Sequence, residues 1–449
     1  MKDLFNGIFL VLAIPLCIGI MIFAWLFLLR NIDVNLLPAL SILLFALPIL
    51  LPITLFYLTY DRWVAFVQTM YIYNQGRATL RIKLPPEVLK SPEAMESVLR
   101  QIHNTSKADN LMQAYLDGKS PLWNSLELVS IGGDVRFYIN VPRKKMKNLV
   151  ESQLYAQYPG IEVFEEPVDY AAELQWKDDF AIMSFHIVKA EDEVLPIRTY
   201  IDMKLDQLPK EEEKVEPMAP LIEYLSTVQP HERVVFQILC EPHVKKTFSL
   251  GTSLKETPTW RKAAQKKVNE IMYRDEKRLS IRSEDEEEPD ARPSLTMGER
   301  DLVAAIERNT CKLAYRVGIR ATYITLDENK FNADNITFML KAFFPYDDES
   351  RNKMGVRWKT DFDYKLFEDF SGTRVTARKK AELEQLKSRT YDAGGGKGND
   401  IHQPKVMSVE ELATIYHIPG SAVVTPGLAR IPSSKTSAPA NLPIGDLPI

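Results

Sequence analysis

The chain has 449 residues, with 56 Lys and Arg, 60 Asp and Glu and a net charge of -4, so no overall basic field exists to coat nucleic acid. Three cysteines are too few for a disulfide framework. The charges are unevenly distributed, because only Lys2, Asp3, Arg30 and Asp33 fall within the first 60 positions. We therefore expect an apolar N-terminal block joined to a larger part of ordinary soluble composition that suits a reducing compartment.

The N-terminal block contains two uncharged, mostly apolar runs, 7–29 and 36–58. At about 1.5 Å per residue, each run is long enough to cross a hydrocarbon core of about 30 Å. The sequence therefore predicts a transmembrane helical hairpin over residues 1–61. More basic residues follow the second run than separate the two, namely Arg62, Arg77, Arg81 and Lys83 against Arg30. This bias predicts a two-pass membrane protein with the bulk of the chain in the cytoplasm.

Residues 62–170 contain the patterns of a first α+β domain. Alternating or apolar runs predict strands at Thr79–Leu84, Ser125–Ile131, Asp134–Val141 and Ile161–Phe164. Apolar residues at helical spacing predict one helix after Pro92 and another around Met146 to Leu154. The order β-α-β-β-α-β is that of the ferredoxin-like, split βαβ unit.

A second α+β domain is predicted over residues 171–375. Strands are expected at Phe180–Val188, Ile197–Met203, Val234–Leu239 and Val317–Leu326, and helices at Pro217–Val228 and around Ile336 to Phe343. A helical arm is inserted at about 250–295, and Thr296 with Glu299 predicts a capping box after it. The predicted fold class is therefore α+β, with a transmembrane hairpin and two ferredoxin-like units, the second carrying the inserted arm.

The C-terminal part differs in composition from the two domains. Residues 376–416 predict a charged helix and a flexible, glycine-rich linker. Residues 417–449 are rich in proline and predict an extended tail that binds a partner rather than packing into a core of its own.

The sequence contains no recognisable catalytic motif. The six histidines lack metal-ligand spacing, and there is no C-x-x-C. The Gly394–Lys397 run is followed by Gly398 where a phosphate loop needs Ser or Thr, and no apolar strand precedes it. We therefore predict no catalytic residue, no metal, no nucleotide-binding site and no cofactor, and the chain is not expected to be an enzyme.

Two basic clusters leave two interpretations open. Solvation of an exposed helix face is the ordinary one. Binding of anionic lipid headgroups or nucleic-acid phosphate is the other. The candidate phosphate- or lipid-contacting residues are Arg143, Lys144, Lys145 and Lys147 in the first cluster and Arg261, Lys262, Lys266 and Lys267, beside Trp260, in the second.

Three stretches carry a family resemblance. They are Trp123–Ile139, Val150–Tyr170 and the segment that begins His417-Ile418-Pro419-Gly420 and continues to Pro443. Together they resemble the membrane-anchored N-terminal module of type IV secretion-like, conjugative DNA-transfer ATPases from an uncharacterised bacterial family of candidate-phylum type. In those proteins the last segment lies just ahead of the motor domain. This sequence reaches Ile449 where that nucleotide-binding domain is expected to begin, so ATP hydrolysis is not carried over.

The resemblance implies a function for the chain. It predicts a non-catalytic platform at the bacterial inner membrane that positions or recruits a separate motor ATPase of a DNA-transfer apparatus. The alternative is a membrane-tethered protein that binds nucleic acid through the basic arm. Expected partners are the lipid bilayer, the motor ATPase, other secretion-apparatus proteins, nucleic acid and further copies of the chain. The candidate partner-binding residues of the tail are Thr425, Pro426, Leu428, Arg430, Lys435, Pro439, Asn441, Leu442 and Pro443.

Overall fold

The structure of the protein is a computed structural model. It describes residues 54–55, 59–60, 62–85, 88, 90–104, 111–177, 179–207, 215–243, 260–272, 295–360, 372–391, 404–420, 423 and 425–431. The chain divides into two compact units. The first, which we call the helical unit, comprises 1–74, 107–120 and 392–401, and the second, the sheet unit, comprises 75–106, 121–391 and 402–449.

The sheet unit is built on one antiparallel sheet of nine strands, in the order β4-β1-β3-β2-β6-β7-β5-β8, with β9 added beside β7. Every pair of neighbouring strands is antiparallel. The strands are β1 (Arg77–Lys83), β2 (Asn124–Ile131), β3 (Asp134–Pro142), β4 (Glu162–Glu165), β5 (Ala181–Lys189), β6 (Glu232–Pro242), β7 (Ala314–Thr325), β8 (Met354–Lys359) and β9 (Lys405–Ser408).

The sheet consists of two halves with the same strand order. The first half runs β4-β1-β3-β2 and contains α3 (Glu93–Gln101) and α5 (Arg143–Gln157). The second runs β8-β5-β7-β6 and contains α6 (Ala219–Ser226) and α10 (Asp334–Lys341). Gly132 and Gly133 form the turn between β2 and β3 at φ of 58° and 89°, a conformation that glycine adopts without strain. Pairing of β2 with β6 joins the halves into a continuous sheet.

The predicted fold class is wrong as stated. The two predicted β-α-β-β-α-β units are the two halves of one nine-stranded antiparallel sheet, joined by the pairing of β2 with β6. In the part of the chain that the structure describes, no helix is both long and apolar enough to span a membrane. The two runs predicted as a transmembrane hairpin, 7–29 and 36–58, lie almost entirely outside the described residues, so the structure lends the hairpin no support.

The predicted strand at Ile197–Met203 is also absent. Its backbone N–H groups bond elsewhere, since Ile197 donates to the Glu411 carboxylate and Tyr200 donates to the Thr414 hydroxyl. The Met203 N–H closes a local turn onto Thr199 O. A backbone whose donors are used in this way has none left for a neighbouring strand.

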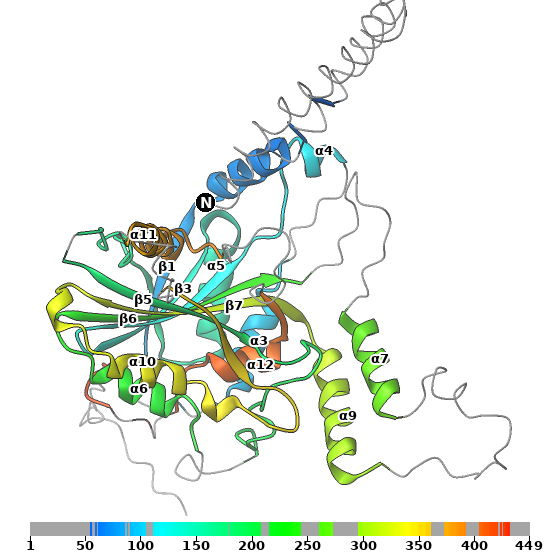
Figure 1. The fold of residues 1–449 in the computed structure, drawn as a ribbon. Coiled ribbons are helices and arrows are strands. Elements are labelled where there is room, and N and C mark those ends of the chain that lie inside the picture. Colours follow the sequence, from blue (N-terminus) through cyan, green and yellow to red (C-terminus); the bar gives the residue numbers. More distant parts are fainter. Residues whose placement is uncertain are drawn as a thin grey trace, which may run out of the picture. The chain divides into compact units, whose positions relative to one another are not determined.

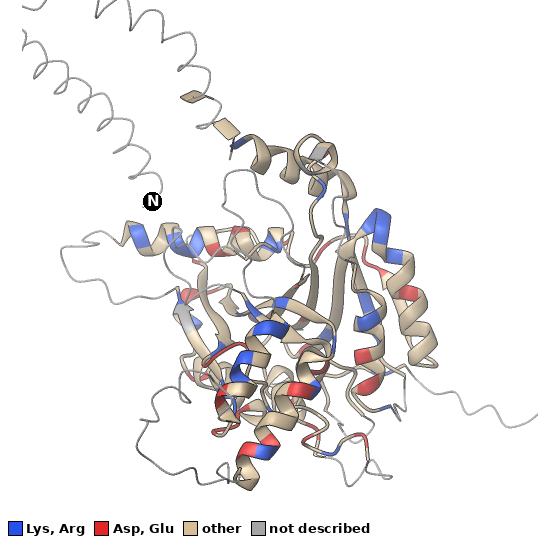
Figure 2. Cartoon of the chain, turned by 90° about the vertical axis from the view of Figure 1, so that its right-hand side faces the viewer, with Lys and Arg blue, Asp and Glu red and all other residues tan. Residues whose placement is uncertain are grey.

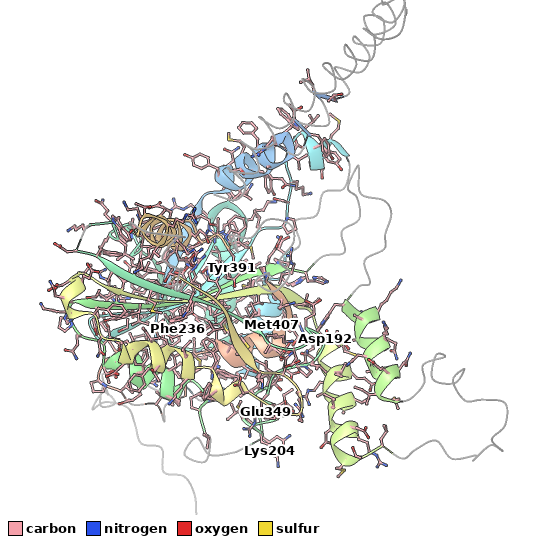
Figure 3. The ribbon with its side chains drawn as sticks, viewed as in Figure 1. Asp192, Lys204, Phe236, Glu349, Tyr391 and Met407 are labelled. Carbon is pink, nitrogen blue, oxygen red and sulfur yellow. The ribbon has the colours of Figure 1, made fainter. Side chains whose placement is uncertain are left out.

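The two faces of the sheet are covered differently. Figure 1 shows α3, α6, α10 and α12 (Val409–Ile415) on one side and α11 (Thr373–Ser388) on the other. The first side holds the main apolar core, which includes Phe236 and Met407, labelled in Figure 3. The side under α11 has a smaller apolar cluster around Leu383 and Leu386. The described residues of the unit also include two short 3₁₀ turns, Glu328–Lys330 and Phe344–Tyr346.

A helical arm, α7 (Trp260–Ile271) and α9 (Met297–Thr310), is inserted between β6 and β7. The predicted capping box at the start of α9 is confirmed, because the side chain of Thr296 and that of Glu299 each bond the backbone N–H of the other. Trp260, Ala264 and Val268 of α7 pack with Val303 and Ile306 of α9 and with Val406 of β9. The arm is therefore fixed to the body through a cluster of its own.

The C-terminal segment is part of the sheet unit. β9 pairs with β7, and every residue of α12 is buried. Further on, the Ile431 N–H donates to Leu84 O at the end of β1, and the Val135 N–H donates to Gly427 O. Residues 405–416, expected in the linker, and the described part of 417–431, expected in a free tail, thus belong to the folded body, because their apolar side chains complete its core.

Candidate functional site

A row of polar side chains crosses the sheet beneath α11. Strand register places Glu127 of β2 opposite Gln237 of β6, Gln237 opposite Arg320 of β7, and Arg320 opposite His186 of β5. All four residues are fully buried. We call them the buried row. Four adjacent polar residues inside a sheet are costly to desolvate unless each one is bonded.

Glu382 of α11 binds one end of the buried row. Its Oε1 accepts from Arg320 Nε at 2.6 Å, lies 2.7 Å from His186 Nε2 and accepts from Ser184 Oγ at 3.2 Å. Burial alone would raise the pKa of Glu382, but the charge of Arg320 and the hydrogen bond with His186 outweigh it and lower the pKa to about 2. Glu382 is therefore ionised and holds α11 against the sheet.

Arg389, just beyond α11, binds the other end. Its guanidinium donates to Glu127 Oε1 at 2.7 Å and to Asp169 Oδ1 at 3.0 Å, while Tyr170 donates to Glu127 Oε2 at 2.8 Å. Burial raises the pKa of Tyr170 well above its ordinary value, and the neighbouring Glu127 charge adds to this. Burial would raise the pKa of Asp169 as well, but the bonds to Arg389 lower it. Arg389 adopts a positive φ of 54°, which is unfavourable for a residue other than glycine, and its side-chain contacts offset this cost.

The buried row has no geometry for nucleophilic catalysis. Ser184, His186 and Glu382 are residue types of a catalytic triad, yet both Ser184 and His186 bond the same Glu382 oxygen. The imidazole therefore does not stand between the hydroxyl and the carboxylate, as activation of a serine requires. Among the described residues, no group of three His, Cys, Asp or Glu could hold a metal ion. The geometry of the buried row is that of a clamp that fixes α11.

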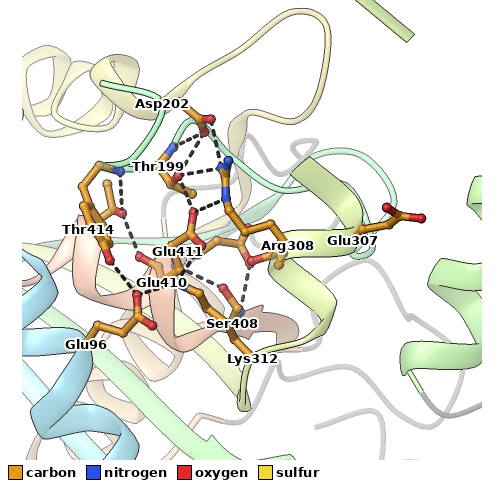
Figure 4. Close-up of polar contacts among 12 residues, drawn as sticks. Glu96, Thr199, Asp202, Glu307, Arg308, Lys312, Ser408, Glu410, Glu411 and Thr414 are labelled. Carbon is orange, nitrogen blue, oxygen red and sulfur yellow. Dashed lines mark hydrogen bonds and ion pairs between the residues drawn. The ribbon is translucent and has the colours of Figure 1, made fainter. Parts of the chain in front are cut away.

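A second buried ionic cluster, which we call the latch, seats α12 (Figure 4). Glu411 lies 2.7 Å from Lys189 Nζ and accepts from Ile197 N at 3.0 Å and Asn309 Nδ2 at 3.1 Å. Glu410 accepts from Thr199 Oγ1 at 2.6 Å and pairs with Arg308 at 3.2 Å and Lys312 at 2.9 Å. The latch thus connects α12 to β5, to α9 and to the loop around Thr199.

His417, two residues after the end of α12, makes a further buried contact between the C-terminal segment and the body. Its Nε2 lies 2.7 Å from Glu216 Oε1, and its Nδ1 lies 3.0 Å from Ala413 O, so both ring nitrogens face acceptors. Burial would lower the pKa of His417, but the Glu216 charge and hydrogen bond outweigh it and raise the pKa. A protonated imidazole, with two donors, satisfies both partners.

The first predicted basic cluster opens α5. Arg143 and Lys147 both pair with Glu165 of β4, Lys147 at 2.7 Å. Lys144 and Lys145 are exposed. The structure therefore brings two of the four cations together onto one carboxylate, which partly neutralises this cluster.

The second predicted basic cluster lies on α7. Arg261, Lys262 and Lys266 are exposed, and Lys267 pairs with Glu270 at 3.2 Å. The arm faces the viewer in Figure 2, where Lys and Arg positions predominate along α7 and both signs alternate along α9. Trp260 is buried behind this face and fixes its orientation. A groove of about 280 Å³ between α7 and α9 is lined by Arg261, Ala264, Gln265, Val268, Glu307, Thr310 and Cys311.

Four of the candidate tail residues are described. Leu428 and Thr425 are buried, and Arg430 donates to Gly420 O at 2.8 Å and to Pro85 O at 3.2 Å. Pro426 is exposed. These bonds are made within the chain itself. Lys435, Pro439, Asn441, Leu442 and Pro443 lie outside the described residues.

The sheet unit defines a class of protein: an antiparallel α/β body of two halves with equal strand order, a clamped helix over a buried polar row, and an inserted helical arm. Residues 70–430 match the model of a family described as Domain of unknown function (DUF8128). Because this match covers most of the sequence, the chain belongs to that family. No curated protein matches the sequence.

Proposed function

We propose that the chain is a non-catalytic platform, located at the bacterial inner membrane, that positions a motor ATPase of a DNA-transfer apparatus. The observation that carries the proposal is the seating of the C-terminal segment. The stretch that resembles the region just ahead of a motor domain is bonded into the sheet unit through β9, the latch and Ile431. The chain beyond Ile431 therefore starts from a fixed point, as positioning a partner requires.

Residues 432–449, with Lys435, Pro439 and Leu442 among them, are the proposed contact for that ATPase. The test is co-purification of the full chain from native membranes, compared with a variant in which 432–449 is replaced by a Gly-Ser stretch of equal length. Cutting earlier would remove the buried His417, Ile418 and Leu428, and loss of binding would then report unfolding. We expect the full chain to retain an ATPase that the variant loses. The proposal is contradicted if the full chain and the variant retain the ATPase equally, or if no ATPase co-purifies with either protein.

Nucleic-acid binding is a second candidate, favoured by the exposed cationic face of α7. Arg261, Lys262 and Lys266 are all exposed on this one helix, so basic side chains are concentrated at its surface. The acidic residue of α7, Glu270, pairs with Lys267 near the other end of the helix. A nucleic-acid backbone supplies closely spaced negative charges of the kind this face fits.

Charge reversal tests this candidate. In fluorescence anisotropy with labelled duplex DNA, the variant carrying Lys262→Glu, Lys266→Glu and Lys267→Glu is expected to bind more weakly than the unaltered protein. The slope of log affinity against log salt should fall by about 0.9 for each phosphate that the variant no longer neutralises. Lys144→Glu with Lys145→Glu, at exposed positions of α5, is the matched control and should change little. Equal affinity of the α7 variant and the unaltered protein excludes this role.

A further inference from the structure

The helical unit exposes an apolar stripe on one helix. Residues 62–75 are helical, and Trp63, Phe66, Met70 and Tyr73 recur at steps of three and four, so their side chains share one face. Their exposed fractions run from 43% to 80%. The helical unit holds seven of the sixteen large hydrophobic side chains that are exposed among the described residues. Such a concentration of exposed apolar surface marks an interaction site rather than ordinary surface.

The described part of the helical unit leaves the stripe exposed and packs beside it on the same helix. Beside the stripe, the chain around Gly118 packs so closely against the helix that a Cβ at that glycine would lie 2.2 Å from Val67 O. Val67 is accordingly buried. Trp63 donates its indole N–H to Tyr115 O at 3.0 Å, which fixes the ring while half of it stays exposed. The exposed orientation of the stripe is thus built into the unit.

The chemistry of the stripe favours lipid as its occupant. Trp and Tyr combine an apolar ring with a polar tip and are enriched where a bilayer meets water. Arg62 is the only charged residue between 62 and 75 and stands at the start of the helix. The sequence from 36 to 58, which ends four residues before Arg62, contains no charged residue at all. The stripe therefore continues the apolar character of the chain directly preceding it.

We propose that the stripe formed by Trp63, Phe66, Met70 and Tyr73 inserts into the interfacial layer of a phospholipid bilayer, with its helix lying along the membrane surface. This goes beyond the proposed function, which rests on the C-terminal segment. A helix in this position buries its apolar face about 5–10 Å into the boundary between headgroups and acyl chains. Phe66 and Met70 would then lie among acyl chains, while the polar tips of Trp63 and Tyr73 stay at headgroup level.

Site-directed spin labelling of the full chain in phosphatidylcholine–phosphatidylglycerol vesicles tests the insertion. Cys17→Ser and Cys311→Ser provide the background, and the buried Cys240 remains. Nitroxides are placed singly at 66, 70 and 73, with a matched control at the exposed Ala65 of the same helix, which is not three or four residues from any member of the stripe. We expect oxygen collision rates at 66, 70 and 73 to exceed that at 65 severalfold, and collision rates with a water-soluble nickel chelate to show the opposite order.

Two outcomes overturn the proposal. Nickel access at 66, 70 and 73 equal to that at 65 means that the stripe faces water. Shielding of the stripe from both oxygen and nickel means that protein covers it, as in an interface between copies. A second measurement needs no label. The fluorescence of Trp63 is the part of the protein's tryptophan emission that is lost in Trp63→Phe, and brominated phospholipid should quench this part. Absence of this quenching also contradicts the insertion. None of these readouts involves α7 or residues 432–449, so this proposal and the proposed function fail independently.

Discussion

Glu382→Ala is expected to lower the free energy of unfolding of the sheet unit by about 3–5 kcal/mol, the range for removing one partner of a buried ion pair. The substitution leaves the Arg320 guanidinium buried without its closest anion, which lies at 2.6 Å, and removes the partner of His186 Nε2. Chemical denaturation of the full chain in detergent, followed by circular dichroism, measures the change. An unfolding midpoint equal to that of the unaltered protein would mean that the clamp does not stabilise α11.

The matched control lies on the same helix. Glu384 is 70% exposed and pairs with Lys387, so Glu384→Ala should change the free energy by no more than about 1 kcal/mol. A pH series adds an independent readout. Because the pKa of Glu382 is lowered to about 2, its stabilising contribution is fully present above its ordinary value of 4.5 and is lost as the pH falls from there toward 2. Glu382→Gln should remove that part of the acid dependence.

Much of the fold follows from patterns in the sequence. The strands at 77–83, 124–131 and 134–142 lie close to where alternation and the Gly132-Gly133 turn predict them, because both signals are local. No local sequence signal predicts that the two halves join into one sheet. The joining depends on β2 and β6 pairing at a sequence separation of about one hundred residues, and nothing in either strand marks its partner.

The buried ionic contacts could be predicted only in part. Glu127, His186 and Arg320 each interrupt an apolar strand pattern, which indicates a polar surface under a covering element but not which element covers it. Their partners, Glu382 on α11 and Arg389 just beyond it, belong to a segment whose composition predicts solvent exposure. Ser408-x-x-Glu411 does fit a capping box, and this local signal marks the start of α12. The proline content beyond residue 416 instead predicts a free tail. Composition alone does not show that apolar side chains of this segment, such as Ile418 and Leu428, pack into the core of the sheet unit.

Glu411→Ala is expected to lower the free energy of unfolding by a similar amount, about 3–5 kcal/mol, because it leaves the buried Lys189 ammonium without its anion. It also removes the acceptor of the Ile197 and Ser408 N–H groups, the latter being the capping contact of α12. Glu411→Gln separates the two effects, since the amide oxygen still accepts hydrogen bonds while the charge is lost. Glu307→Gln, an exposed position on α9 in Figure 4, is the control.

Amide hydrogen exchange locates the effect of Glu411→Ala. If the latch seats the C-terminal segment, exchange should accelerate in β9, in α12 and around Ile197, while the amides of β2 and β3 keep their protection. Equal acceleration across the sheet would instead mean that Glu411 acts on global stability alone. The local result matters for the proposed platform, because a segment that opens at the latch loses the fixed point at Ile431. Glu411→Ala should then weaken ATPase retention even with residues 432–449 intact.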